Sequence, residues 1–217
     1  MILWCAPCPL YNGKMKTQID KINLCIKSRQ FIGVLSSSSA GKASFLEMIL
    51  KHEHPASSRL RILGDDQKDT KFSMVYLTKE ISLKGELTVG DFLKFQACFY
   101  SAYSIFEESH LLNIFNIQKS SKIEALTIEE QYKIQIISSL ASRPKLILID
   151  EMTEALSHRT RTLFFKELER FKRSYGSTII LATNVAEDLH EVADNILFID
   201  ESDVSFHTVN KNLDLAA

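Results

Sequence analysis

The sequence lacks any apolar run near the roughly 20 residues that a helix needs to cross a bilayer. Its formal net charge is only −1, so it has no excess of basic residues to attract nucleic acid, and we expect no nucleic-acid partner. The opening MILWCAPCPLYNGKMK has no basic region ahead of its apolar residues, so we do not expect a secretory leader. With 217 residues, 45% of them hydrophobic, the chain is typical of a globular protein with one sizeable core.

Cysteine is sparse, and the arrangements that bind zinc are missing. The chain has 4 cysteines, of which Cys5 and Cys8 form a CxxC pair. No second pair lies at a zinc-binding spacing, and the strand-then-helix setting of a redox motif is also missing. The 6 histidines are scattered along the chain. We therefore predict reduced, structural cysteines and no zinc centre.

Glycine is scarce as well, with 7 residues in all, and one stretch has fewer than expected. Residues 31–49, FIGVLSSSSAGKASFLEMI, run from an apolar strand through a tight loop ending at Gly41 and Lys42 into a helical apolar pattern. This layout is typical of a phosphate-binding loop, in which backbone N–H groups and a lysine bind phosphates. Such loops usually carry more glycines, because glycine permits positive φ and close approach of the backbone to the ligand.

Strand patterns lie on both sides of a helical region. Two strands are expected before the loop, at 22–26 and 31–36, and two more after its helix, at 59–66 and 72–77. Near the C-terminus the runs KLILID, STIILAT and NILFID are short and almost continuously apolar. Such runs are typical of strands buried on both faces of a parallel sheet.

Residues 88–142 are helical in pattern, with no convincing strand. Thr88 and Asp91 stand at the spacing of a capping pair ahead of FLKFQACFY. FEESHLLNIF predicts a second helix and TIEEQYKIQIISSLAS a third, whose early acidic residues suit a helix N-terminus. The sequence therefore predicts an α/β core interrupted by a helical insert.

The most specific chemical signal is KLILIDE, in which a buried strand delivers Asp150 and Glu151 to its carboxyl end. A carboxylate at this place can hold the water shell of Mg²⁺, and a second one can orient the water that attacks a γ-phosphate. Alone, the pair could simply begin a loop and cap the next helix. Downstream of an A-G-K loop, the catalytic interpretation is favoured.

In this order, the motifs resemble the nucleotide-binding domain of an ATP-binding-cassette (ABC) transporter over nearly the whole chain. The resemblance implies an α/β P-loop NTPase fold with a mostly parallel core sheet flanked by helices, an N-terminal antiparallel β portion and an inserted helical subdomain. It also implies a single domain, 1–217. The core would comprise 1–86 and 143–217, and the helical subdomain 87–142.

The resemblance also assigns roles to particular residues. It makes Glu151 the catalytic residue, Asp150 the metal ligand and Tyr11 an adenine-stacking residue. Lys79 and Asn184 fall at the positions that contact the γ-phosphate or its metal. The phosphate loop would comprise Ser36, Ser37, Ser38, Ser39, Ala40, Gly41, Lys42, Ala43 and Ser44. The signature-like segment would comprise Leu126, Thr127, Ile128, Glu129 and Glu130.

The loop departs from the family pattern at three of these positions. Ser36 and Ser39 replace glycines, and a left-handed non-glycine residue costs on the order of 1–2 kcal/mol. Ala43 replaces the hydroxyl residue that would ligate Mg²⁺, an ion that demands near-ideal octahedral coordination. We therefore expect weak nucleotide binding with little dependence on the metal.

Further departures affect catalysis. Lys79 stands where the family has a glutamine, Asn184 where it has a histidine and Ser157 where it has an aspartate. Two signature glycines become Ile128 and Glu129, which would oppose a partner's phosphate sterically and electrostatically. Efficient hydrolysis is therefore not expected, because phosphoryl transfer depends on positioning and charge stabilisation.

The resemblance implies an ATP-binding subunit with impaired or absent hydrolysis, using ATP and, more weakly, Mg²⁺. It would couple to an integral membrane transporter subunit and work as a homodimer or as a heterodimer with another ATP-binding subunit. Its place would be cytoplasmic, peripheral on the inner face of the membrane. ELTV ahead of FLKFQACFY is most similar to exporter-type members. Two alternatives stay open, a competent ATPase that tolerates the substitutions and a soluble regulatory or scaffold pseudo-ATPase.

Overall fold

The computed structural model describes the chain in several segments. These are residues 2–5, 10–12, 15–17, 24–36, 39–51, 59–61, 73–80, 83, 85–200 and 204–209. Within this part of the chain, no helix is both long and apolar enough to span a membrane.

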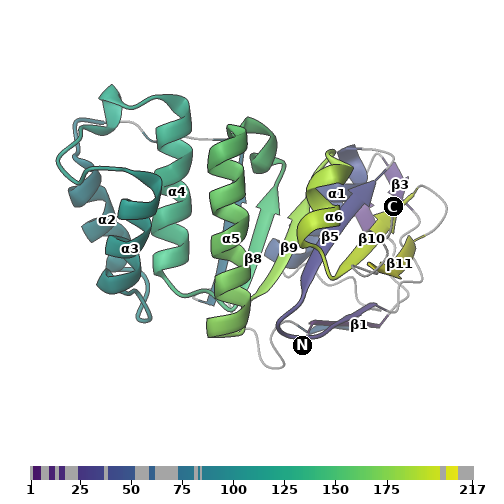
Figure 1. The fold of residues 1–217 in the computed structure, drawn as a ribbon. Coiled ribbons are helices and arrows are strands. Elements are labelled where there is room, and N and C mark those ends of the chain that lie inside the picture. The colour runs from purple at the N-terminus through teal and green to yellow at the C-terminus, as the bar shows by residue number, and fades with distance from the viewer. Residues whose placement is uncertain are drawn as a thin grey trace, which may run out of the picture.

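A six-stranded sheet forms the centre of the fold (Figure 1). Its strands are β5 (Phe31–Ser36), β7 (Met74–Thr78), β8 (Leu146–Asp150), β9 (Thr178–Ala182), β10 (Asn195–Ile199) and β11 (Val204–Thr208). They lie in the order β11-β10-β5-β9-β8-β7, and all pairings are parallel except that of β10 with β11. The predicted mostly parallel core is therefore confirmed, and the carboxyl ends of its parallel strands meet at one edge.

Helices cover both faces of this sheet. They are α1 (Ser39–Lys51) on one face, and α4 (Ile128–Ala141), α5 (His158–Tyr175) and α6 (Ala186–Val192) on the other. Because successive strand residues point to opposite faces, Leu148 packs in the cluster that includes Phe45 of α1. Its neighbour Ile147 packs in the cluster that includes Phe164 of α5. Burial on both faces explains why these strands are continuously apolar.

The inserted helical subdomain contains α2 (Val89–Ala97), α3 (Ile105–Phe115) and α4. Figure 1 shows these helices gathered at one end of the molecule, beside α5. Side-chain oxygens of Thr88, Ser104 and Thr127 accept hydrogen bonds from backbone N–H groups in the first turns of the three helices. The expected cap at Thr88 is therefore present. The bounds 87–142 for this subdomain stay a prediction.

An antiparallel β portion lies at the N-terminal end of the chain, as expected. It has a sheet with the order β4-β1-β6 and a separate β2-β3 pair. Its strands are β1 (Ile2–Cys5), β2 (Leu10–Asn12), β3 (Met15–Thr17), β4 (Leu24–Ile26) and β6 (Arg59–Arg61).

Two expectations about the elements were wrong, and one strand was missed. The sequence patterns predicted two strands before the loop, whereas β1 to β5 all precede it. Strands of three or four residues contain too little alternation to give a pattern. The edge strand β11 was not foreseen either. The helix expected after Gly41 and Lys42 begins earlier, at Ser39, so both residues lie in its first turn.

Candidate functional site

The candidate site lies where the carboxyl ends of β5, β7, β8 and β9 meet the N-terminus of α1. The loop after β5 leads to Lys42, whose side chain is buried. Strand β8 ends at Asp150, and Lys79 and Asn184 follow β7 and β9. Because the pairing of β7 with β8 and of β8 with β9 is parallel and in register, these residues come to the same edge of the sheet.

Three donor side chains converge on the carboxylate of Glu151. Lys42 Nζ lies 3.2 Å from Oε1, and Asn184 Nδ2 donates to the same oxygen across 3.0 Å. Lys79 Nζ lies 2.5 Å from Oε2, so the two ammonium groups bind opposite oxygens. Lys42 also donates to Asn184 Oδ1. The expected meeting of Lys42 with the acidic pair is therefore present at Glu151.

These contacts determine the charge state of Glu151. The hydrogen bond from Lys79, assisted by those from Lys42 and Asn184, lowers the pKa of the Glu151 carboxyl despite its partial burial. The side chain of Glu151 is 14% exposed, whereas that of Lys79 is 56% exposed. The carboxylate is thus ionised and held by a buried cation on one side and a solvent-facing cation on the other.

The backbone of Glu151 has an unusual conformation. Its φ is +52° and its ψ is 9°, in the left-handed region that non-glycine residues seldom adopt. The N–H of Glu151 donates to the carbonyl of Ala182 across 2.9 Å, and Asn184 N–H donates to Glu154 Oε1 across 3.0 Å. A left-handed residue costs on the order of 1–2 kcal/mol, which these surrounding bonds offset.

Asp150 has a different partner, Tyr76 on the neighbouring strand. Tyr76 pairs in register with Leu148, so Asp150 lies two residues further along the same face of the sheet. The hydroxyl of Tyr76 donates to Asp150 Oδ2 across 2.7 Å. Burial, and then this hydrogen bond, raises the pKa of Tyr76, which therefore stays a donor at neutral pH.

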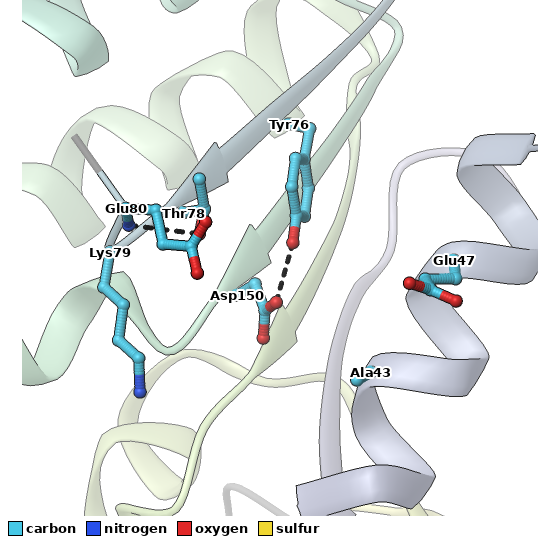
Figure 2. A pocket seen from close by; sticks show the side chains of 7 residues that line it. All are labelled: Ala43, Glu47, Tyr76, Thr78, Lys79, Glu80 and Asp150. Carbon is cyan, nitrogen blue, oxygen red and sulfur yellow. Dashed lines mark hydrogen bonds between the residues drawn. The ribbon is translucent and has the colours of Figure 1, made fainter. Parts of the chain in front are cut away.

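A pocket of about 280 Å³ opens beside this pair. Figure 2 shows Tyr76, Thr78 and Asp150 on the side of the sheet, and Ala43 and Glu47 of α1 facing them. Lys79 and Glu80 complete the lining. In the part of the chain that the structure describes, no group of three or more His, Cys, Asp or Glu residues could hold a metal ion.

The structure describes only part of the phosphate-loop prediction. Ser37 and Ser38 lie outside the described residues. Ser39 and Ala40 lie in the first turn of α1 and Tyr11 lies in β2, but their side chains are not among those described. A Cβ on Gly41 would come within 2.6 Å of Ser36 Oγ, so a larger residue there would require the Ser36 side chain to move. Ala43 and Ser44 follow Lys42 in α1, with Ala43 on the pocket.

The signature-like segment makes its contacts within the helical subdomain and with α5. Thr127 caps α4 in a reciprocal capping box with Glu130, and Leu126 packs against the larger core cluster. Ile128 is 63% exposed. Glu129 accepts hydrogen bonds of 2.5 Å from both Ser157 Oγ and Thr160 Oγ1. The hydrogen bond from Ser157, followed by that from Thr160, lowers the pKa of Glu129.

Sequence reasoning missed three residues that shape the site. They are Tyr76, Glu154 and Tyr132, whose hydroxyl on α4 donates to the Lys79 carbonyl across 2.8 Å. Tyr132 thus connects the helical subdomain to the residue that pairs with Glu151. Of these three residues, only Tyr76 could have been found from the sequence, because the alternation of side chains along a strand places it on the same face as Thr78.

Comparison with known proteins shows what the chain is similar to. A family model described as "ABC transporter" matches residues 19–154. The chain is 24% identical to a methionine import ATP-binding protein of Xylella fastidiosa, over 87% of this chain and 60% of that protein. It is 26% identical to a spermidine/putrescine import ATP-binding protein of Spiroplasma citri, over 88% of this chain and 56% of that protein. The chain thus spans little more than half the length of these relatives.

Solved structures share the fold. An ATP-binding subunit of an ABC transporter superposes with a TM-score of 0.82 at 18% identity, covering 96% of this chain and 90% of the other. An ATP-binding cassette dimer in a post-hydrolysis state, bound to ADP and phosphate, superposes with a TM-score of 0.78 at 19% identity. That match covers 97% of this chain and 99% of the other.

Proposed function

Because the chain belongs to the ABC transporter family, we propose that it is an ATP-binding subunit of a membrane transporter, with weak nucleotide binding and impaired hydrolysis. The observation that carries this proposal is the convergence of Lys42, Lys79 and Asn184 on Glu151 at the N-terminus of α1. Cationic and amide donors beside a helix N-terminus are the groups that bind phosphates.

In this proposal the loop residues Ser36 to Ser44 bind the triphosphate. Lys42 pairs with the β- and γ-phosphates, and the serines contribute backbone N–H groups and hydroxyl donors. Tyr11 stacks on the adenine. The Glu151 carboxylate already bound to Lys42 competes with a phosphate for this ammonium and repels the phosphate, because both groups are anionic. This competition supports weak rather than tight binding.

Impaired hydrolysis follows from the contacts of Glu151. A general base needs a free carboxylate oxygen that faces the attacking water, and its pKa should lie near the working pH. Both oxygens of Glu151 are bound by donors, and Lys79 lowers the pKa of the group. Glu151 is therefore a poor base in this arrangement.

The residues present do not fit the Mg²⁺ ion that the family implies. Ala43 offers no oxygen, and Tyr76 binds one carboxylate oxygen of Asp150. Lys79, at the position of a metal-contacting glutamine, carries a positive charge that repels a cation. We therefore propose that Mg²⁺ binds weakly if at all and that no step in this site depends on it.

The subunit would pair with an integral membrane subunit and with a second ATP-binding subunit, on the cytoplasmic face of the membrane. Tyr132 supports this coupling role, because it joins α4 of the helical subdomain to the backbone of Lys79. Ile128 and Glu129 disfavour a phosphate at the signature-like segment, so self-pairing would leave both composite sites impaired. The exporter-type character of the ELTV stretch stays a prediction, since the relatives named above are import proteins.

Three measurements test the proposal. We expect ATP to bind weakly, phosphate release to stay at the background level of Glu151→Gln, and an integral membrane protein to co-purify. Turnover above background that Glu151→Gln abolishes would instead show a competent ATPase. Nucleotide binding without any membrane partner or turnover would favour the soluble regulatory alternative.

A further inference from the structure

We infer that Lys79 takes the place of the divalent cation, so that the ligand of this site is the metal-free nucleoside triphosphate. The inference rests on the proposed nucleotide-binding function and names the form of the nucleotide that binds. Three observations carry it: the position of the Lys79 ammonium across Glu151 from Lys42, the lining of the pocket at Ala43 and Asp150, and the solvent exposure of the Lys79 side chain.

The first observation is that Lys79 lies across Glu151 from Lys42. The two ammonium groups contact Oε2 at 2.5 Å and Oε1 at 3.2 Å of one carboxylate. An anionic group that replaced this carboxylate would meet a cation on each side. In the family arrangement, a lysine and a metal ion flank the terminal phosphates in this way. Here both flanking cations belong to the chain.

The second observation is that, among the described residues, no group of three or more His, Cys, Asp or Glu could hold a metal ion, although Glu47, Glu80 and Asp150 each line the pocket. Ala43 faces it with a methyl group, and Asp150 already accepts the hydroxyl hydrogen of Tyr76 across 2.7 Å (Figure 2). A divalent ion bound beside Asp150 would also lie near the Lys79 ammonium. The Lys79 ammonium and a divalent cation in the same pocket would repel each other.

The third observation is that Lys79 can move towards a ligand, whereas Lys42 cannot move far. The Lys79 side chain is 56% exposed, and its backbone is fixed by the Tyr132 hydroxyl on its carbonyl. A lysine with a fixed backbone and a solvent-facing, flexible side chain can follow a phosphate from Glu151 into the pocket. Lys42, with its side chain only 2% exposed, supplies the stationary cation.

The test is the affinity of the purified chain for ATP, measured by calorimetry in EDTA and in millimolar Mg²⁺. We expect the two affinities to agree within about threefold, and Lys79→Gln to weaken binding in EDTA by about tenfold or more, as for loss of a charge-assisted hydrogen bond. Lys79→Arg should keep most of the affinity in EDTA. Lys94→Gln, which removes an exposed lysine of α2 in the helical subdomain, is the control and should change nothing.

A gain-of-function variant makes the inference sharper. The triple variant combines Ala43→Ser, which provides a hydroxyl ligand, Tyr76→Phe, which frees Asp150, and Lys79→Gln, which removes the competing charge. It should bind ATP at least about tenfold more tightly with Mg²⁺ than without. If the unaltered chain binds ATP only with Mg²⁺, the inference and the proposed weak binding of Mg²⁺ are wrong, while the proposed ATP-binding role stands. If it binds ATP in neither condition, both are wrong.

Discussion

Tyr76 donates its hydroxyl hydrogen to Asp150 across 2.7 Å. A side chain of β7 thus supplies a hydrogen-bond donor to the acidic residue that ends β8. The bond joins β7 to β8 at the edge where the candidate site lies. A neutral donor on a carboxylate reduces the need for a cation there. The contact is thus both a structural bond and a reason why the pocket does not require a metal ion.

Tyr76→Phe should therefore change both stability and the response to Mg²⁺. Loss of a hydrogen bond to a charged group in a half-buried place should lower the free energy of unfolding by about 1–2 kcal/mol. The freed Asp150 oxygen repels a metal-free triphosphate and attracts a cation. The ratio of ATP affinity with Mg²⁺ to ATP affinity without it should rise by about threefold. This rise is smaller than the ratio expected for the variant that also carries Ala43→Ser and Lys79→Gln.

Tyr103→Phe is the matched control for this variant. Tyr103 donates to Glu108 across 2.6 Å, a similar tyrosine–carboxylate bond within the helical subdomain. We expect a comparable loss of stability in urea unfolding and no change in the Mg²⁺ ratio. Equal effects of the two variants on nucleotide binding would show that Tyr76 acts only through stability.

The sequence predicted the parts of the fold that depend on continuous local patterns. The runs containing β8, β9 and β10 are long and apolar because both sheet faces are covered, and each was placed within a residue or two. The meeting of Lys42 with Glu151 could be predicted because parallel strands bring their carboxyl ends to one edge. Short strands such as β2 and β3 carry no such pattern.

Contacts that depend on strand order and helix packing could not be read from the sequence. Tyr76 reaches Asp150 only because β7 is the neighbour of β8, which local patterns do not specify. Glu129, whose opposition to a phosphate stays a prediction, also accepts hydrogen bonds from the hydroxyls of Ser157 and Thr160 in the structure. Its partners are set by the packing of α4 beside α5, between residues about thirty positions apart.

Gly41 tests the tight packing of the phosphate loop. A methyl group there would lie 2.6 Å from Ser36 Oγ, too close without a rotation of the Ser36 side chain. Gly41→Ala should cost about 1 kcal/mol of stability, at the low end for overpacking, and should weaken ATP binding. Removing the obstructing oxygen with Ser36→Ala in the same chain should recover much of both losses, relative to Ser36→Ala alone.

Gly90→Ala is the control for this pair. Its Cβ would meet the Lys119 carbonyl oxygen at 3.3 Å, and the residue lies inside α2, where alanine favours the helix. We expect a change of stability of less than about 1 kcal/mol and no effect on ATP. If Ser36→Ala fails to rescue Gly41→Ala, the defect has another cause than this contact.

Arg170 on α5 holds the helical subdomain to the core through Glu107 of α3, which is 2% exposed. Its guanidinium donates to both oxygens of Glu107, at 3.2 and 2.5 Å, and to Glu167 at 2.7 Å. Although burial opposes ionisation, the bonds from Arg170 and Tyr175 lower the pKa of Glu107. Arg170→Ala would leave a buried carboxylate without its cation, at a cost of about 3 kcal/mol.

Arg173→Ala, three positions along α5, provides the comparison, because Arg173 is 77% exposed and pairs with Glu169 at 2.7 Å. An exposed pair of this kind contributes less than about 1 kcal/mol. Urea unfolding should therefore separate the two variants clearly, and Glu107→Gln with Arg170→Met should recover part of the loss, since residue 107 then carries no buried charge. Equal, small effects of Arg170→Ala and Arg173→Ala would show that α3 is held to α5 by apolar packing and not by this ion pair.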